Sequence, residues 1–105
     1  MARHKFKAIR TELDGIKFDS KLEASYYQHL KFLQKVGEVV FFLRQTPIHL
    51  PGNVKMVVDF QVFNSDGTVD FVDVKGVETD KFKTKLAVLE AIYPIKLKIV
   101  KKGDF

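Results

Sequence analysis

Two segments of the chain repeat their apolar residues at the spacing of an α-helix. The first follows Ser20, a favourable N-cap residue, and predicts a helix that runs to about Val36 and ends at Gly37. The second is expected to begin near residues 79–80 and to stop at Pro94, because proline does not continue a helix. Its apolar stripe consists of Phe82, Leu86, Leu89 and Tyr93.

The first half of the chain also carries two β-strand signals. Asp14-Gly15 is a common hairpin dipeptide and predicts a small β-ribbon over residues 10–18. Val39–Leu43 is a continuous apolar run, which is typical of a strand covered on both faces. Pro47 and Pro51-Gly52 are expected to break the segment that follows it.

The second half predicts three further strand segments. Residues 54–63 alternate between apolar and polar, residues 64–68 read as a turn, and residues 69–75 form the partner strand. A last alternating strand covers residues 95–100 and follows the second helix, so we expect a parallel, right-handed crossover. The predicted order is β-ribbon, helix, three strands, helix and strand. The fold class is therefore α/β, with a central mixed β-sheet flanked by helices and a restriction-endonuclease-like core.

The length of 105 residues predicts a single domain over residues 1–105, and its composition, 46% hydrophobic and 12% aromatic, is that of a folded globule. Cysteine is absent, which excludes disulfides and cysteine-based zinc sites. No segment resembles a signal peptide or a membrane span. We therefore expect a soluble, cytoplasmic protein that needs no membrane and no organic cofactor.

The net charge of +5 is unevenly distributed. Residues 1–10 form a predicted flexible basic arm that carries Arg3, Lys5, Lys7 and Arg10 and is expected to order on DNA. The beginning of the second helix adds Lys81, Lys83 and Lys85. Residues 56–74, in contrast, contain four aspartates and no Lys or Arg. An acidic centre between basic flanks suits a metal-using enzyme that acts on a polyanion, although a merely solvated basic surface has the same charge pattern.

The strand register decides whether two of these aspartates meet. If the turn lets Phe63 face Val69, Asp59 stands directly opposite Asp73. A two-residue Asp66-Gly67 turn would instead place Val74 opposite Asp59. We favour the first register, because the second would place the two aspartates on opposite faces of the sheet with no shared use.

Opposed carboxylates repel each other, and a hard divalent cation such as Mg²⁺ would offset that repulsion. Lys75, two residues after Asp73, lies on the same strand face and is placed to orient a water or to neutralise charge on a phosphate. Glu23 falls in the inward stripe of the first helix. A capping box with Ser20 would give Glu23 a purely structural role, and that role is compatible with a carboxylate that also reaches the metal.

This set of residues resembles the PD-(D/E)xK nuclease superfamily. The order and spacing look most like small phage and RecU-type Holliday-junction resolvases. Asp14–Ser20, Asp73–Gly76 and Tyr93-Pro94 also resemble a family of small phage proteins without an assigned function, over nearly the whole chain. Two departures are Asp73, where many members have Glu, and Val58, where a proline would precede the aspartate.

The resemblance implies a nuclease that depends on Mg²⁺, accepts Mn²⁺ and leaves a 5′-phosphate. Its metal ligands would be Glu23, Asp59 and Asp73, and its catalytic lysine Lys75. Gln45 is a further candidate near the metal or DNA, and a turn glutamine explains it equally well. Lys81, Lys83 and Lys85 are candidate DNA-binding residues. Lys81 and Lys85 share a helix face and Lys83 points elsewhere, so Lys85 in particular is a candidate clamp for DNA.

The leading hypothesis is a structure-selective endonuclease of branched DNA, encoded by a phage or prophage and acting in replication or recombination. Symmetric cleavage of two strands calls for a homodimer, with Val39–Leu43 and the β-ribbon as pairing surfaces. The alternatives are a sequence- or end-directed nuclease of the same superfamily, and a non-catalytic DNA-binding or accessory module of a phage complex.

Overall fold

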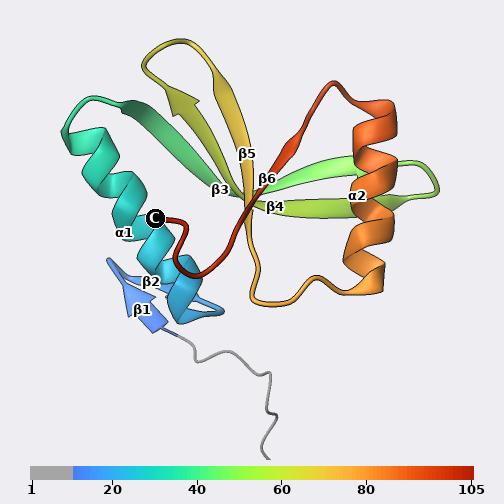
Figure 1. The fold of residues 1–105 in the computed structure, drawn as a ribbon, viewed down its shortest axis with the longest axis horizontal. Coiled ribbons are helices and arrows are strands. Elements are labelled where there is room, and N and C mark those ends of the chain that lie inside the picture. Colours follow the sequence, from blue (N-terminus) through green and yellow to red (C-terminus); the bar gives the residue numbers. More distant parts are fainter. Residues whose placement is uncertain (1–10) are drawn as a thin grey trace, which may run out of the picture.

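The computed structural model describes residues 11–105, and its elements follow the predicted order (Figure 1). They are β1 (Thr11–Leu13), β2 (Ile16–Phe18), α1 (Lys21–Lys35), β3 (Val39–Leu50), β4 (Val54–Asn64), β5 (Val69–Val74), α2 (Asp80–Ile92) and β6 (Leu97–Val100). The main sheet has the order β3-β4-β5-β6, in which only the β5–β6 pair is parallel. The described chain is therefore an α/β fold with a mixed sheet and two flanking helices, as predicted.

The predicted hairpin and helix starts are confirmed. Asp14 and Gly15 both have positive φ, 52° and 76°, which is the two-residue turn that Asp-Gly favours between β1 and β2. The Tyr27 hydroxyl donates to Asp14 at 2.8 Å and ties this hairpin to α1. Ser20 and Thr79 cap α1 and α2, each by accepting the N–H three residues on.

The strand β3 differs from the prediction in two respects. Pro47 does not break it, because β3 is an edge strand of the sheet and can turn the missing N–H away from its neighbour. Nor is the run Val39–Leu43 covered on both faces: the side chains of Val40 and Leu43 are 58% and 47% exposed. The continuous apolar pattern here reflects one buried face and one open apolar face.

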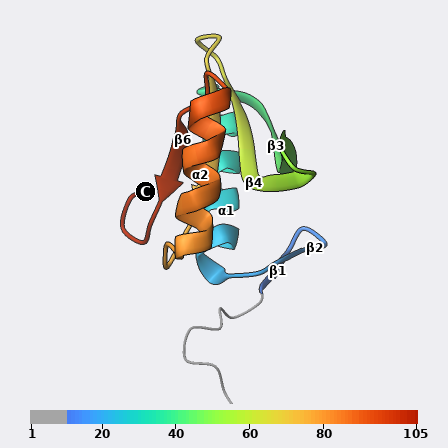
Figure 2. The same ribbon diagram turned by 90° about the vertical axis from the view of Figure 1, so that its right-hand side faces the viewer.

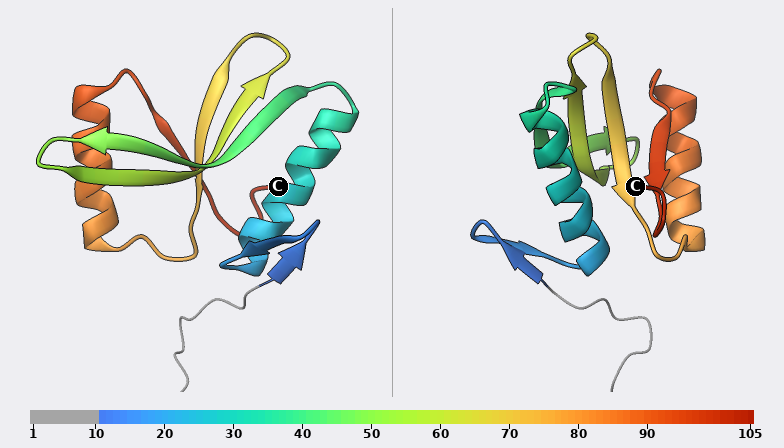
Figure 3. Two further views of the ribbon diagram at one scale, coloured as in Figure 1. Left: turned by 180° about the vertical axis from the view of Figure 1, so that it is seen from behind. Right: turned by 60° about the vertical axis from the view of Figure 1, so that its left-hand side comes forward.

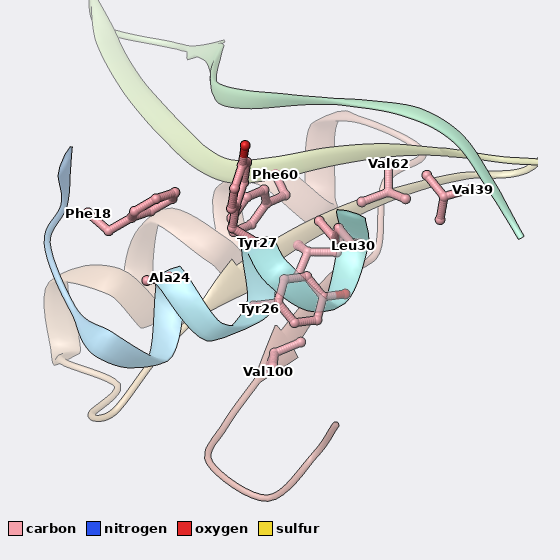
Figure 4. Packing of buried hydrophobic residues seen from close by; sticks show 10 residues of the cluster. Phe18, Ala24, Tyr26, Tyr27, Leu30, Val39, Phe60, Val62 and Val100 are labelled. Carbon is pink, nitrogen blue, oxygen red and sulfur yellow. The ribbon is translucent and has the colours of Figure 1, made fainter. Parts of the chain in front are cut away.

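Two apolar cores form, one beneath each helix. The α1 core includes Phe18, Tyr27, Leu30, Phe60 and Val72 (Figure 4). The α2 core includes Val58, Leu89 and Leu97, so β5 and β6 lie between the two helices (Figures 2 and 3). Complete burial of a side chain of this size contributes about 1.5–3 kcal/mol.

One face of β4 serves both cores. Phe60 and Val62 pack in the α1 core, whereas Met56 and Val58 on the same face pack in the α2 core. The β3–β4 ribbon is therefore strongly twisted, and the change from one core to the other falls at Asp59. This is the residue around which the candidate site is built.

Neither helix in residues 11–105 combines the length and apolar character that crossing a lipid bilayer requires. The predicted basic arm with Arg3, Lys5, Lys7 and Arg10 lies outside the described residues.

Candidate functional site

The pairing of β4 with β5 brings Asp59 opposite Asp73. Phe63 pairs with Val69, and the ladder continues to Phe60 and Val72, so the next pair in the same register is Asp59 and Asp73. The predicted register is confirmed. Beyond Phe60 and Val72 the two strands separate, since β4 continues along β3 while β5 continues along β6.

The two carboxylates bridge the strands where the backbone ladder stops. Asp59 donates its backbone N–H to Asp73 Oδ1 at 2.9 Å, and Val74 donates its N–H to Asp59 Oδ2 at 2.9 Å. Asp73 is only 3% exposed. Each aspartate thus fixes one oxygen on the opposite strand and leaves Asp59 Oδ1 and Asp73 Oδ2 for other partners.

Lys75 lies beside Asp73, as its position two residues further along the strand predicts. Its Nζ is 3.5 Å from Asp73 Oδ2 and 4.4 Å from the centre of the Phe82 ring. The carboxylate and the aromatic ring of α2 together hold the ammonium group. Its side chain remains 30% exposed, so a ligand can reach the charge.

Glu23 contributes to the helix cap with its backbone and to the site with its carboxylate. Its N–H donates to Ser20 Oγ at 3.0 Å, which is half of the predicted capping box. Its Oε2 accepts from Gln45 Nε2 at 3.2 Å and lies 3.6 Å from Arg44 Nη2. Glu23 is 6% exposed, and the capping role does not explain where this buried carboxylate points.

Gln45 connects Glu23 to the aspartates. Its Nε2 also lies 3.5 Å from Asp59 Oδ1, so one amide group bridges two carboxylates. Its φ of 54° is unusual for a non-glycine residue within a strand, and such a conformation costs on the order of 1 kcal/mol. Gln45 therefore belongs to the cluster rather than to an ordinary turn.

Arg44 is a member of the cluster that the sequence analysis missed. Its guanidinium lies 4.5 Å from the centre of the Phe18 ring, next to Glu23. Its Nε is buried and has no hydrogen-bond partner. The signal was present: with β3 extended past Leu43, Arg44 follows Phe42 by two residues and shares its inward face.

The electrostatics of the cluster are dominated by its carboxylates. Burial, reinforced by the neighbouring charge of Asp73, raises the pKa of Asp59 to about 7. Burial also raises the pKa of Glu23, while the nearby Arg44 acts in the opposite direction. Burial and mutual repulsion thus disfavour the charged carboxylates, and a bound cation would offset both effects.

Carboxylate oxygens, of which this cluster has three pairs, are ligands that a hard cation prefers. Asp59 Oδ1 and Glu23 Oε2 both contact the Gln45 amide, and Asp73 Oδ2 contacts the Lys75 ammonium. Positively polarised hydrogens thus already stand where a cation would be held. As arranged, no three Asp, Glu or His side chains of residues 11–105 form a ready ligand set. An ion shared by Glu23 and Asp59 would compete with the Gln45 amide for the same two oxygens.

The other predicted residues divide into two groups. Lys81 and Lys85 line a cleft of α2 together with Asp73, Lys75 and Thr79, whereas Lys83, also a DNA-binding candidate, is not among the residues that line it. The remaining two acids of residues 56–74 serve the β4–β5 turn: Asp66 accepts from Thr68, and Asp70 accepts from Asn64. The geometry therefore separates the site aspartates from the turn aspartates.

Among curated proteins, no sequence matches this chain. A family model does match it, over residues 3–104, and thus includes every residue of the cluster described above. The chain belongs to this family, which is described as "Protein of unknown function (DUF1064)".

Proposed function

We propose that this protein is a metal-dependent DNA endonuclease, a hydrolase of phosphodiester bonds that uses Glu23, Asp59, Asp73 and Lys75. The observation that carries the proposal is the pair of opposed aspartates beside Lys75. Each aspartate has one oxygen anchored to the opposite strand and the other beside a side chain, Gln45 for Asp59 and Lys75 for Asp73. An ammonium beside two carboxylates also compensates their charge, and the partial exposure of Lys75 leaves that ammonium within reach of a phosphate.

The proposed reaction is hydrolysis of the bond between phosphorus and the 3′ oxygen. A water oxygen bonds to phosphorus as that bond breaks, which gives a 5′-phosphate and a 3′-hydroxyl. When bound, Mg²⁺ would polarise a phosphate oxygen and favour loss of a proton from the attacking water. Glu23, Asp59 and Asp73 would hold the ion through the oxygens that now face Gln45 and Lys75.

Lys75 has a defined part in this scheme. Its Nζ would donate to a non-bridging phosphate oxygen or to the attacking water, and would neutralise charge that grows in the transition state. Phe82 and Asp73 keep the ammonium in place before substrate arrives. Such prior positioning makes a charge effective, because little reorganisation is then needed.

Branched DNA is the substrate that we propose, in phage replication or recombination. The support is the resemblance to resolvases described above together with the lysine-lined cleft beside Asp73. Resolution of a junction needs two cuts, so we propose a homodimer. The open apolar face of β3, where Val40 and Leu43 are exposed, is the pairing surface; Leu43→Lys should then give a monomer by size-exclusion chromatography with light scattering.

The test is incubation with a labelled four-way junction, a linear duplex and a single strand, each with Mg²⁺, Mn²⁺ or EDTA. The variants are Asp73→Asn and Lys75→Met. Their matched controls are Glu12→Gln and Lys98→Met, which alter exposed residues that are not members of the cluster. We expect metal-dependent cleavage that is lost in the first two variants and kept in the controls.

Three outcomes discriminate the alternatives. Cleavage that persists in EDTA, or in Asp73→Asn, overturns the mechanism. Tight binding without cleavage under every metal supports the non-catalytic DNA-binding module. Cleavage of the linear duplex as fast as of the junction favours a sequence- or end-directed nuclease over a resolvase.

A further inference from the structure

The cleft beside Asp73 is one end of a longer groove along α2. A second hollow lies between α2 and the tip of the β3–β4 hairpin, and Lys81 and Lys85 line both hollows. The hairpin extends past α2 (Figure 1), and Leu50, Pro51 and Val54 near its tip line the second hollow, so the groove runs from Asp73 towards that tip. This second hollow has no part in the site described above.

The two ends of the groove differ in the charge and polarity of the residues that line them. Its charged residues in the shared region are Lys81 and Lys85, and Lys75 adds a third cation at the catalytic end, where Asp73 is the one acid that lines it. Lys85 donates to the Lys55 carbonyl at 3.3 Å, which directs this long side chain across the groove.

The far hollow is lined mainly by apolar residues. Leu50, Pro51 and Val54 come from the hairpin, and Val88 comes from α2. Val54 is 39% exposed, although its neighbours Leu50 and Met56 are buried. An open apolar surface that continues from a row of cations fits a ligand that alternates anionic and flat apolar groups.

An unpaired nucleic-acid strand is such a ligand. Its phosphates are anionic, and its bases expose apolar faces that pairing and stacking would otherwise cover. A duplex would offer the lysines phosphates but would leave the apolar hollow unused. An acidic peptide would meet the lysines in the same way and also lacks flat bases.

We propose that the groove binds a single-stranded arm of the DNA substrate next to the cleaved bond. Lys81 and Lys85 contact its phosphates, and one base lies against Val54 and Val88. The statement that this strand leads to a cleaved bond at Asp73 rests on the proposed function. The inference then specifies the substrate class: branched DNA in which a strand is unpaired next to the cut, as in a flap, a fork or the opened centre of a junction.

Binding in EDTA tests the groove without any cleavage. Fluorescence anisotropy would compare a labelled oligothymidylate of about 12 nucleotides, within the usual range of single-strand site sizes, with an abasic oligomer of equal charge. We expect the wild type to bind the thymidylate about fivefold more tightly or better. Lys81→Ala and Lys85→Ala should each weaken binding several-fold and lower the salt slope by about 0.7.

Matched variants identify the contacts. Lys83→Ala removes an equal charge from the same helix outside the groove and should change affinity less than about twofold. Val54→Ser should abolish the preference for thymidylate over the abasic oligomer. Val69→Ser, at a residue 41% exposed against 39% for Val54, should keep it.

Several results would overturn the inference. Equal binding of the thymidylate and abasic oligomers would mean that the groove contacts phosphates and no base. An equal loss in Lys83→Ala and Lys85→Ala would mean general surface charge, and displacement by an acidic peptide of matched charge would mean a protein ligand. Cleavage with none of the expected binding pattern defeats this inference alone. The binding pattern without any cleavage upholds the groove and defeats the proposed enzyme.

Discussion

The backbone N–H of Asp59 donates to Asp73 Oδ1 at 2.9 Å, so the side chain of one site residue is fastened to the main chain of the other. This bond couples the fold to the site. The same carboxylate that we propose as a metal ligand also closes the gap at which β4 and β5 separate. Substitutions at Asp73 therefore have a structural and a chemical consequence, and the two can be separated.

The first prediction compares Asp73→Asn with Asp73→Ala. Asparagine keeps an oxygen that can accept from Asp59 N–H, whereas alanine leaves a largely buried donor without a partner. We expect Asp73→Ala to lower the free energy of unfolding by about 1–3 kcal/mol relative to Asp73→Asn, measured by urea denaturation.

The chemical consequence should be the same in both variants. Each removes the anionic oxygen that pairs with Lys75, so nuclease activity should fall by roughly 10²-fold or more in both. If Asp73→Asn retained activity while Asp73→Ala lost it, the carboxylate would be structural only.

The sequence predicted the elements and the register well because local signals agree there. Asp14-Gly15 fixes the hairpin turn, and the turn before Val69 fixes which β4 residue faces Asp73. Pro47 misled the prediction, since whether proline breaks a strand depends on its place in the sheet, which only the tertiary fold decides. Ending the strand early also concealed Arg44.

The second prediction concerns pH and the stability of the metal-free protein. The pKa of Asp59 is about 7 in the folded chain, against an ordinary value of 3.8. Between these values the folded state holds a proton that the unfolded state has released. Stability should therefore fall as pH rises from about 4 to about 7, by at most about 1.4 kcal/mol per pH unit, and level off above that.

Thermal denaturation in EDTA across this pH range provides the measurement. Asp59→Asn cannot titrate and should flatten the dependence, while Glu12→Gln, at an exposed position, should leave it as in the wild type. A wild-type stability that rises between about pH 5 and pH 7 would contradict the assigned direction.

The third prediction concerns metal binding in the absence of DNA. An ion held by Glu23, Asp59 and Asp73 would relieve their repulsion in the folded state alone. At Mn²⁺ or Mg²⁺ about 100-fold above the dissociation constant, the gain is about 2.7 kcal/mol, or roughly 10 °C or more in Tm for a domain of this size.

The stabilisation should have two signatures. It should be larger at about pH 8 than at about pH 5, because protonated carboxylates bind cations poorly. It should also be absent in Asp59→Asn. An equal rise in Tm for wild type and Asp59→Asn would place the ion elsewhere on the surface.

The direction of the Glu23 carboxylate could not be predicted from the sequence pattern. The Ser20-x-x-Glu23 spacing explains its backbone bond to the cap, and the structure contains that bond. The direction of its carboxylate depends on Arg44 and Gln45, about twenty residues away on β3, and on the positive φ of Gln45. No local sequence signal announces such a backbone conformation.

The last prediction concerns Arg44, which neutralises Glu23 in the metal-free cluster. Replacing it by Met keeps much of its contact with Phe18 but leaves a carboxylate that is 8% exposed without its cation. At about pH 8 we expect a loss of about 1–3 kcal/mol, since removal of one partner strands the other charge. Without Arg44, which lowers the pKa of Glu23, that pKa rises further, so protonation at about pH 5 should recover part of the loss.

Urea denaturation at both pH values is the measurement, and Glu23→Gln in the Arg44→Met background should remove the pH dependence of the loss. A loss of equal size at both pH values would mean that Arg44 acts through packing on Phe18 rather than through charge.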